Sequence, residues 1–204
     1  MIEITFPDGA SRSYEINSTP FDIANSISEG LSRNVISASF NGNTIETTTQ
    51  LKENGKLIFY TWNEQEGKKA FWHSSAHVLA QVLEELYSGI KLTIGPAISN
   101  GFYYDVDFGN HTMSEKDFPK IEKRMIEISR EKHLFKLKSI SKKEALDFYK
   151  NHKNEYKIEL IENLEDGTIS FCNHDNFTDL CRGGHLPNTG FIKAVKLLSV
   201  AGAY

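Results

Sequence analysis

Residues 2–16 read IEITFPDGASRSYEI, with apolar and polar residues alternating on both sides of a Pro-Asp-Gly sequence. A period of two residues is typical of a strand with one buried face, because successive side chains point to opposite sides of a sheet. A short turn between two such runs indicates a β-hairpin. The sequence therefore predicts that the chain begins with two antiparallel strands.

A helix pattern follows the hairpin at residues 18–31. Ser18 or Thr19 can cap its N-terminus, Pro20 suits the first helical position, and apolar residues recur at helical spacing. Two more apolar runs, VISASF and KLIFYTW, come next and are typical of strands. The order of hairpin, helix and further strands predicts a small β-grasp, ubiquitin-like domain over residues 1–62.

Residues 63–204 predict a larger α+β domain, and we interpret the polar stretch at 61–69 as the linker to it. Helices are expected at about 70–88, 114–132 and 141–150, where Ser141 with Glu144 matches a capping box. Five segments are predicted to be strands: FYYDVDF at 102–108, FKLKSI at 135–140, YKIELI at 156–161, TISF at 168–171 and FIKAVKLLSV at 191–200. The predicted fold class is thus α+β, with a small β-grasp domain followed by the larger domain.

The composition disfavours several classes of protein. A net charge of −4 argues against bulk electrostatic coating of nucleic acid, and no signal peptide or membrane span is recognisable. Cys172 and Cys181 are too few for a disulfide framework, so a cytoplasmic location is expected. Residues 116–143 hold ten Lys or Arg against four Asp or Glu, which fits either solvated helix faces or a phosphate-contacting surface.

Two histidines lie one helical turn apart in the stretch HSSAH, residues 73–77. At 3.6 residues per turn, the apolar residues that follow share one side of the helix, while His73 and His77 fall roughly opposite, beside Ala80 and Glu84. The two rings are therefore either exposed surface residues or groups that converge on one ligand, water or metal ion.

A second pair has the same spacing in CRGGH, residues 181–185, which is predicted to be a tight loop because each glycine would cost about 1 kcal/mol in a helix interior. The glycines allow Cys181 and His185 to turn toward one point. Together with His73 and His77 they make three imidazoles and one thiol, a plausible tetrahedral zinc set. A site with all four ligands from the protein would be structural rather than catalytic.

Four motifs in order carry a family resemblance: HSSAH, TIGPAISNGFYYD, EYK and DLCRGGH. Behind a ubiquitin-like domain, they resemble the N-terminal half of bacterial threonyl-tRNA synthetases over essentially the whole chain, including the terminal SVAGAY. In that family the first domain is called the TGS domain, and the second is an editing domain related to those of alanyl-tRNA synthetases and alanyl-tRNA deacylases. One departure is the loop CRGGH, where the family often has a proline in place of the second glycine, which bears on the rigidity of the loop. The resemblance implies a fragment that stops before the aminoacylation domain.

The resemblance implies hydrolysis of tRNA(Thr) mischarged with serine, at the ester of the 3′-terminal adenosine. Serine lacks only one methyl group of threonine, worth about 1 to 3 kcal/mol in a pocket, so initial selection needs correction. His73 and His77 are expected to orient or activate the attacking water. The family match makes Lys157 a candidate for contacting the oxyanion or the adenosine, and Asp179 for the substrate ammonium or hydroxyl group. Without the resemblance, Lys157 would be the solvent face of a strand and Asp179 a turn cap.

Four further residues are expected at the substrate pocket. By the same resemblance, Cys181 and His185 would close the pocket, and Gly95 is assigned to substrate binding. Tyr103 and Tyr104 are expected on opposite faces of a strand, and Tyr104 is the one expected to stack on or hydrogen-bond to the terminal adenosine. The plain structural alternative for Cys181 is a small buried hydrophobe.

The resemblance requires no cofactor. Zinc is possible at the His and Cys set, as in the related alanyl editing domains, but we expect catalysis without a metal. ATP would serve only the missing aminoacylation domain of the full-length enzyme, which ligates threonine to tRNA and is expected to be a homodimer through its other domains. No aminoacylation by the fragment and no membrane partner are expected. Two alternatives stay open: a non-catalytic, zinc-stabilised tRNA-binding module that uses the basic segment at 116–143, and an alanyl-tRNA deacylase.

Overall fold

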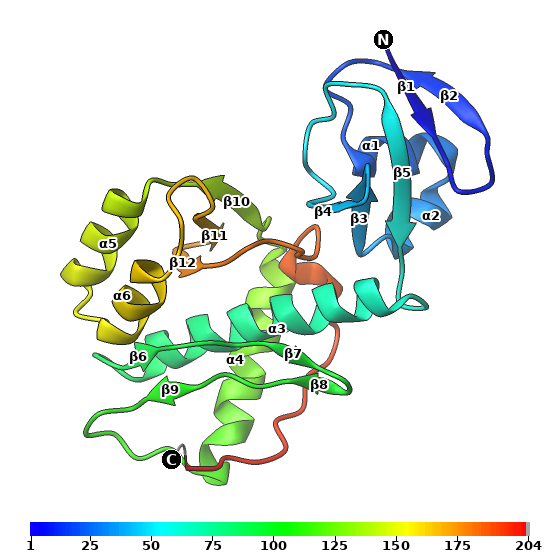
Figure 1. Cartoon of the computed structure of the whole chain (residues 1–204). Helices are drawn as coiled ribbons and strands as arrows, with labels where there is room; N and C mark the ends of the chain where they lie inside the picture. Colours follow the sequence, from blue (N-terminus) through cyan, green and yellow to red (C-terminus); the bar gives the residue numbers. More distant parts are fainter. Residues whose placement is uncertain (203–204) are drawn as a thin grey trace. The chain divides into compact units, whose positions relative to one another are not determined.

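The computed structural model describes residues 1–202, and the chain forms two compact units that are considered one at a time (Figure 1). The first unit consists of Met1–Phe71 and the short segment Gly183–Pro187, and the second unit consists of Trp72–Arg182 and residues 188–202. No helix within residues 1–202 is long and apolar enough to cross a membrane.

The first unit is a β-grasp fold, as predicted. Its five strands are β1 (Ile2–Thr5), β2 (Ser11–Tyr14), β3 (Ser37–Phe40), β4 (Asn43–Ile45) and β5 (Gly55–Tyr60). They form one sheet in the order β2-β1-β5-β3-β4, in which β1 and β5 are parallel and all other neighbours are antiparallel. The predicted N-terminal hairpin is confirmed as β1 and β2.

The predicted helix at 18–31 is two helices, α1 (Pro20–Ile27) and α2 (Glu29–Asn34). Ser28 separates them because its backbone is extended while its side chain accepts a hydrogen bond from the Leu31 N–H and so starts a new helix. Helix α1 packs its Ile23 into the core of the unit. The buried members of that core are Ile2, Ile4, Ile23, Ala38, Leu51 and Leu57.

Helix α3 (Gln65–Leu86) begins earlier than predicted, so the interpretation of 61–69 as a linker is wrong. Glu64 stabilises this start, because its carboxylate accepts hydrogen bonds from the backbone N–H and the hydroxyl of Thr61. Gly67 lies so close to the chain that a Cβ there would be 1.9 Å from the Thr61 carbonyl oxygen. Gly67 of the predicted linker thus allows the chain to pack closely against Thr61.

The second unit combines most of α3 with a three-stranded antiparallel sheet in the order β10-β11-β12 (Figure 1). These strands are β10 (Lys136–Ser139), β11 (Ser170–His174) and β12 (Phe177–Leu180). The other helices are α4 (Phe118–Glu131), α5 (Lys142–Asn151), α6 (Glu155–Glu162) and the short 3₁₀ helices η1 (Glu115–Asp117) and η2 (Thr189–Phe191). Two short antiparallel pairs complete the unit: β6 (Lys91–Leu92) with β9 (Val106–Asp107), and β7 (Ala97–Ile98) with β8 (Gly101–Phe102).

The segment YKIELI was predicted to be a strand and is helix α6 instead. The side chain of Asn154 caps the helix by accepting a hydrogen bond from the Lys157 N–H. Ile158 and Ile161 lie three residues apart and both pack against the core formed with Tyr149 of α5. In six residues a helical and an alternating pattern are hard to separate, and the cap together with the packing partner decides between them.

Two other strand predictions are also corrected. FYYDVDF is interrupted, since Phe102 ends β8, Val106 begins β9, and neither Tyr103 nor Tyr104 lies in a strand. FIKAVKLLSV forms no strand; apart from its first residue in η2 it follows an irregular path. Its Ile192 is nonetheless buried, and the Ile192 carbonyl oxygen accepts a hydrogen bond from the Ser129 hydroxyl of α4. Packing against a helix therefore accounts for Ile192, whereas Leu198 and Val200 farther along the segment are exposed.

Candidate functional site

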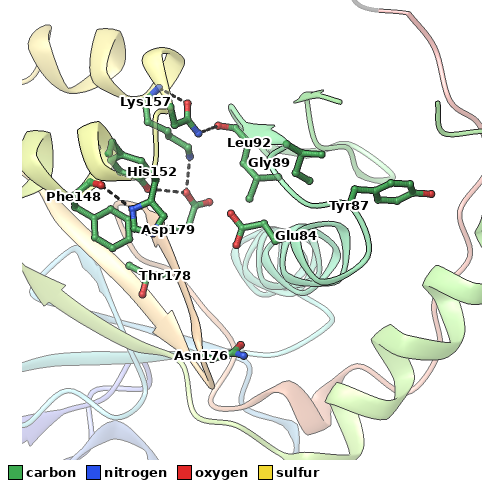
Figure 2. Close-up of a pocket in the computed structure, with 13 residues that line it drawn as sticks. Glu84, Tyr87, Gly89, Leu92, Phe148, His152, Lys157, Asn176, Thr178 and Asp179 are labelled. Carbon is green, nitrogen blue, oxygen red and sulfur yellow. Dashed lines mark hydrogen bonds and ion pairs between the residues drawn. The ribbon is translucent and has the colours of Figure 1, made fainter. Parts of the chain in front are cut away.

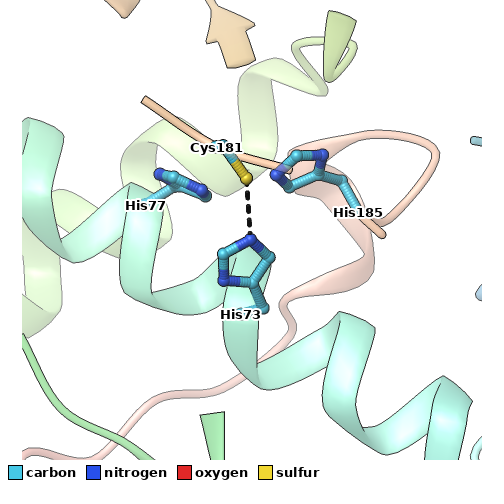
Figure 3. A group of neighbouring side chains, drawn as sticks. All are labelled: His73, His77, Cys181 and His185. Carbon is cyan, nitrogen blue, oxygen red and sulfur yellow. Dashed lines mark hydrogen bonds between the residues drawn. The ribbon is translucent and has the colours of Figure 1, made fainter. Parts of the chain in front are cut away.

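Helix α3 presents His73 and His77 one turn apart, and Cys181 faces them from the loop after β12 (Figure 3). The centroids of the two imidazole rings are 4.7 Å apart. The Nε2 atom of His73 lies 3.0 Å from the Cys181 Sγ atom. His77 is 3% exposed, so the interpretation as a plain surface residue is wrong for it.

These three side chains suit a transition metal. Their donor atoms lie within 4.8 Å of one another, and the ligand atoms of a tetrahedral zinc ion, at about 2.0 to 2.3 Å from the metal, require only a modest contraction of this group. Two imidazoles and a thiol are also the donor types that zinc prefers. His185, the fourth predicted ligand, belongs to the first unit, where its Nδ1 atom lies 2.9 Å from a carboxylate oxygen of Glu46.

The second unit places a buried carboxylate, Asp179 of β12, next to His77. Asp179 is 3% exposed, and strand pairing sets it opposite Cys172 of β11. Its Oδ1 atom lies 2.6 Å from Lys157 Nζ, 2.8 Å from Leu180 N and 3.3 Å from Tyr149 Oη. Its Oδ2 atom lies 2.5 Å from Tyr104 Oη and 3.3 Å from His77 Nδ1. Asp179 is therefore the centre of the polar network.

Lys157 belongs to this network because it lies on helix α6, not on the solvent face of a strand. Its side chain is buried and its ammonium group is within 2.6 Å of Asp179 and 3.5 Å of the Tyr104 hydroxyl. The capping residue Asn154 fixes this end of the helix, because its amide group also donates a hydrogen bond to the Leu92 carbonyl oxygen. The helix start thus sets the direction in which Lys157 enters the site.

Charge interactions outweigh burial in this network. Burial by itself would raise the pKa of Asp179, but the Lys157 ammonium group and His77 hold that pKa well below its ordinary value. Burial by itself would lower the pKa of His77, but the Cys181 sulfur and the Asp179 carboxylate raise it above its ordinary value. Burial, followed by the charge of Asp179, raises the pKa of Tyr104 and of Tyr149, so both hydroxyls stay protonated and donate to the carboxylate.

A cavity of about 340 Å³ opens beside the ion pair (Figure 2). Lys157 and Asp179 line one side, and Glu84 of α3, seven residues after His77, faces them. Burial of Glu84, followed by the negative charge of Asp179, raises the pKa of Glu84 to about 7. The apolar wall includes Leu92 of β6. The cavity therefore brings a cationic and an anionic side chain next to a partly apolar space.

Gly95 supports the network indirectly. A Cβ atom at this position would lie 2.3 Å from the Tyr104 ring, so only glycine leaves the ring where its hydroxyl reaches Asp179. Tyr104 itself is held by packing against a small core formed by Ala80, Leu92 and Phe177. Tyr103 is 42% exposed and points away from that core.

The second unit brings six predicted residues into one region: His73, His77, Tyr104, Lys157, Asp179 and Cys181. Sequence reasoning missed Tyr149, whose hydroxyl accepts a hydrogen bond from the Leu180 N–H besides donating to Asp179. It lies on the apolar face of α5, where nothing in the sequence distinguishes it from a core residue. The sequence did indicate Glu84 as a candidate, because this residue lies on the same helix face as His73 and His77.

Family models match two parts of the chain. The TGS domain family matches residues 2–61, and the family described as the second additional domain of threonyl and alanyl tRNA synthetases matches residues 169–202. The second match includes Asp179 and Cys181.

Curated relatives match over the whole chain. A threonine–tRNA ligase of Flavobacterium psychrophilum is 65% identical over 204 residues, that of Flavobacterium johnsoniae is 66% identical over 204 residues, and that of Cytophaga hutchinsonii is 52% identical over 204 residues. Each alignment covers 100% of this chain. The chain spans 31%, 31% and 32% of the length of these relatives, respectively.

We expect Asp179→Asn to lower the free energy of unfolding by about 3 to 5 kcal/mol at pH 7, because it leaves the Lys157 ammonium group buried without its counter-charge. Urea denaturation measures this change, with Asp147→Asn at an exposed position of α5 as the control, expected within about 0.5 kcal/mol of the parent. Because the pKa of Asp179 is lower in the folded chain, its stabilisation is present above about pH 4 and is lost as the pH falls further. The Asn variant should lack that acid-induced loss, and an unchanged loss would contradict the assignment.

We expect Gly95→Ala to displace the Tyr104 ring and to lower the free energy of unfolding by about 1 to 3 kcal/mol through overpacking. Replacing Tyr104 by Leu in the same chain should recover part of that loss, so the two substitutions should not be additive in a double-mutant cycle. Gly30→Ala is the matched control, since a Cβ there meets no atom closer than 3.9 Å. Full additivity would show that Gly95 and Tyr104 act independently.

Proposed function

Since the chain matches the N-terminal region of threonine–tRNA ligases along its entire length, we propose that it hydrolyses the ester of seryl-tRNA(Thr), the product of mischarging with serine. The observation that carries this proposal is the buried network of Lys157, Asp179 and His77 beside a cavity of about 340 Å³. Ester hydrolysis needs a proton acceptor, a cationic or hydrogen-bonding group for the oxyanion, and a pocket for the acyl group.

We assign the proton transfer to the two histidines of α3. Asp179 lies 3.3 Å from His77 Nδ1, and a carboxylate in this position orients an imidazole and stabilises its protonated form. His77 is thus assigned as the base that accepts the proton, and His73, paired with Cys181, as the group that orients the attacking water. A carboxylate–imidazole pair with this geometry takes a proton from water as the water oxygen attacks the ester carbonyl.

The role of Lys157 is electrostatic. Its ammonium group lines the cavity and lies 2.6 Å from the Asp179 carboxylate. A fixed positive charge in a site that excludes water stabilises the oxyanion more strongly than it would in bulk solvent. Asp179 is fully engaged by donors, so we assign it to holding Lys157 and His77, in place of the expected contact with the substrate ammonium or hydroxyl group.

Selectivity for serine follows from exclusion by size. A pocket that admits the serine side chain and clashes with the threonine methyl group corrects errors that binding discrimination of about 1 to 3 kcal/mol leaves behind. Alanine is smaller than serine and also fits such a pocket, and one matching family is named for both threonyl and alanyl enzymes. Alanyl-tRNA therefore belongs among the test substrates.

We assign ligation of threonine to tRNA, together with ATP binding and homodimer contacts, to the part of the relatives that this chain does not span. The sequence supports this assignment because it contains no phosphate-cradling glycine motif followed by Lys and Ser or Thr. tRNA as the partner and a cytoplasmic location are part of the same proposal.

We expect this chain to hydrolyse seryl-tRNA(Thr) faster than threonyl-tRNA(Thr), and the double variant His73→Ala, His77→Ala to be at least about 100-fold slower, because general-base catalysis contributes about 100- to 10,000-fold. Single-turnover release of labelled serine gives the rate. His111→Ala is the control, since His111 is exposed and contacts the Ser88 carbonyl oxygen instead of this network.

Equal rates for the double variant and the parent chain would contradict the assignment to these histidines. Faster hydrolysis of alanyl-tRNA than of seryl-tRNA would move the proposal to the deacylase alternative. Binding of tRNA with no hydrolysis of any of the three esters would favour a non-catalytic binding module.

A bound zinc ion would be held by His73, His77 and Cys181, and a water in the remaining fourth position would have its pKa lowered to about 7. We propose that hydrolysis does not depend on it. Metal analysis of protein purified without added zinc is expected to give well below one equivalent, and EDTA is expected to leave the urea midpoint unchanged. One equivalent of zinc together with unfolding in EDTA would instead establish the zinc-stabilised module.

A further inference from the structure

The first unit contains a buried carboxylate whose partners lie almost 140 positions away in the sequence. Glu46 directly follows β4 and is 6% exposed. Its Oε1 atom accepts hydrogen bonds from the Gly184 N–H at 3.0 Å and from His185 Nδ1 at 2.9 Å, and its Oε2 atom accepts one from the His185 N–H at 3.2 Å. All three bonds go to the second half of the CRGGH loop.

The position of Glu46 is set by the sheet. Ile45 pairs with Ala38 of β3, and the backbone carbonyl of Glu46 accepts a hydrogen bond from the Thr49 N–H, so the residue is fixed on both sides. Gly184 adopts a φ of +86°, and a Cβ atom at this position would lie 3.7 Å from the Thr44 side chain. A glycine here allows the left-handed backbone and also supplies the N–H donor that a proline would lack.

The chemistry of the three partners requires a carboxylate. Two are backbone N–H groups, which only donate, and the third is a ring nitrogen that can donate or accept. A carboxylate only accepts, so it matches two backbone donors and selects the His185 tautomer that carries its proton on Nδ1. In neutral His185, Nε2 then holds the lone pair, which is the nitrogen able to accept a proton or bind a metal.

We propose that Glu46 is a positioning residue for His185: it anchors Gly184 and His185 of the CRGGH loop and fixes His185 in the Nδ1–H tautomer. The contribution to hydrolysis rests on the proposed function, in which His185 closes the pocket. The tautomer and the loop anchorage do not depend on that function.

Glu46→Gln tests the proposal in the complete 204-residue chain. The glutamine side chain has one acceptor oxygen and one NH2 donor group, in place of two acceptor oxygens. Its NH2 group must therefore either face another donor or favour the His185 tautomer with the proton on Nε2, in which Nδ1 accepts. Long-range ¹H–¹⁵N correlation spectra of the EDTA-treated protein distinguish the two tautomers by the ¹⁵N shift of each ring nitrogen. Glu53→Gln is the matched control, an exposed glutamate of the same unit.

We expect Nδ1–H in the parent chain and in Glu53→Gln, and Nε2–H or a mixture in Glu46→Gln. For seryl-tRNA hydrolysis we expect kcat to fall about 10- to 100-fold in Glu46→Gln with KM within about twofold, as is typical for partners that orient a functional imidazole. Glu46→Asp, which keeps both acceptors on a shorter arm, should recover part of kcat. A purely structural role would leave the tautomer unchanged and would lower only stability.

An Nε2–H tautomer of His185 in the parent chain would overturn the proposal even if Glu46→Gln fails to fold. An unchanged tautomer and kcat in a folded Glu46→Gln would also overturn it. If the parent chain hydrolyses none of the esters, the proposed function fails, while the spectra still decide whether Glu46 sets the state of His185.

Discussion

The ion pair between Lys157 and Asp179 is the interaction on which the rest of the second unit depends. Two charges removed from water cost several kcal/mol each unless they meet a partner and fill their remaining hydrogen-bonding positions. Asp179 meets this condition with five neighbouring donor groups, drawn from β12, α3, α5, α6 and the segment between β8 and β9. The Asp179 carboxylate thus holds these five segments together, because each of them contributes one group that contacts it.

Asp179 and Glu84 both line the cavity, but their surroundings give the two carboxyl groups different charge behaviour. The tyrosine hydroxyls and the ammonium group saturate Asp179, so the carboxylate is a fixed counter-charge and not a group available to a ligand. Glu84 differs, because it faces the cavity and its pKa is raised to about 7. The cavity therefore has one acid that is ionised at neutral pH and one that changes charge near neutral pH, because the surroundings of the two carboxyl groups differ.

Each of two histidines is paired with a carboxylate in its own unit. His77 has Asp179 in the second unit, and His185 has Glu46 in the first. In both pairs the carboxylate contacts Nδ1 of the ring. Each carboxylate also accepts a hydrogen bond from a backbone N–H group: Asp179 from Leu180, the residue before Cys181, and Glu46 from His185 itself.

The sequence by itself determined the β-grasp fold, the helices of the second unit from α3 to α5, and the residue types of the site. Periodicity and capping residues are local, so Thr19, Ser141 and the alternation in residues 2–16 are sufficient for these elements. The motifs HSSAH and CRGGH likewise predicted that His73, His77 and Cys181 lie close together, which the structure confirms. Only tertiary structure decided that YKIELI is a helix, that FIKAVKLLSV is not a strand, that Tyr149 contacts Asp179 and that Glu46 contacts His185. Those outcomes depend on which distant groups a short segment meets, and hydrogen bonding between residues 46 and 185 leaves no periodic trace in the chain that joins them.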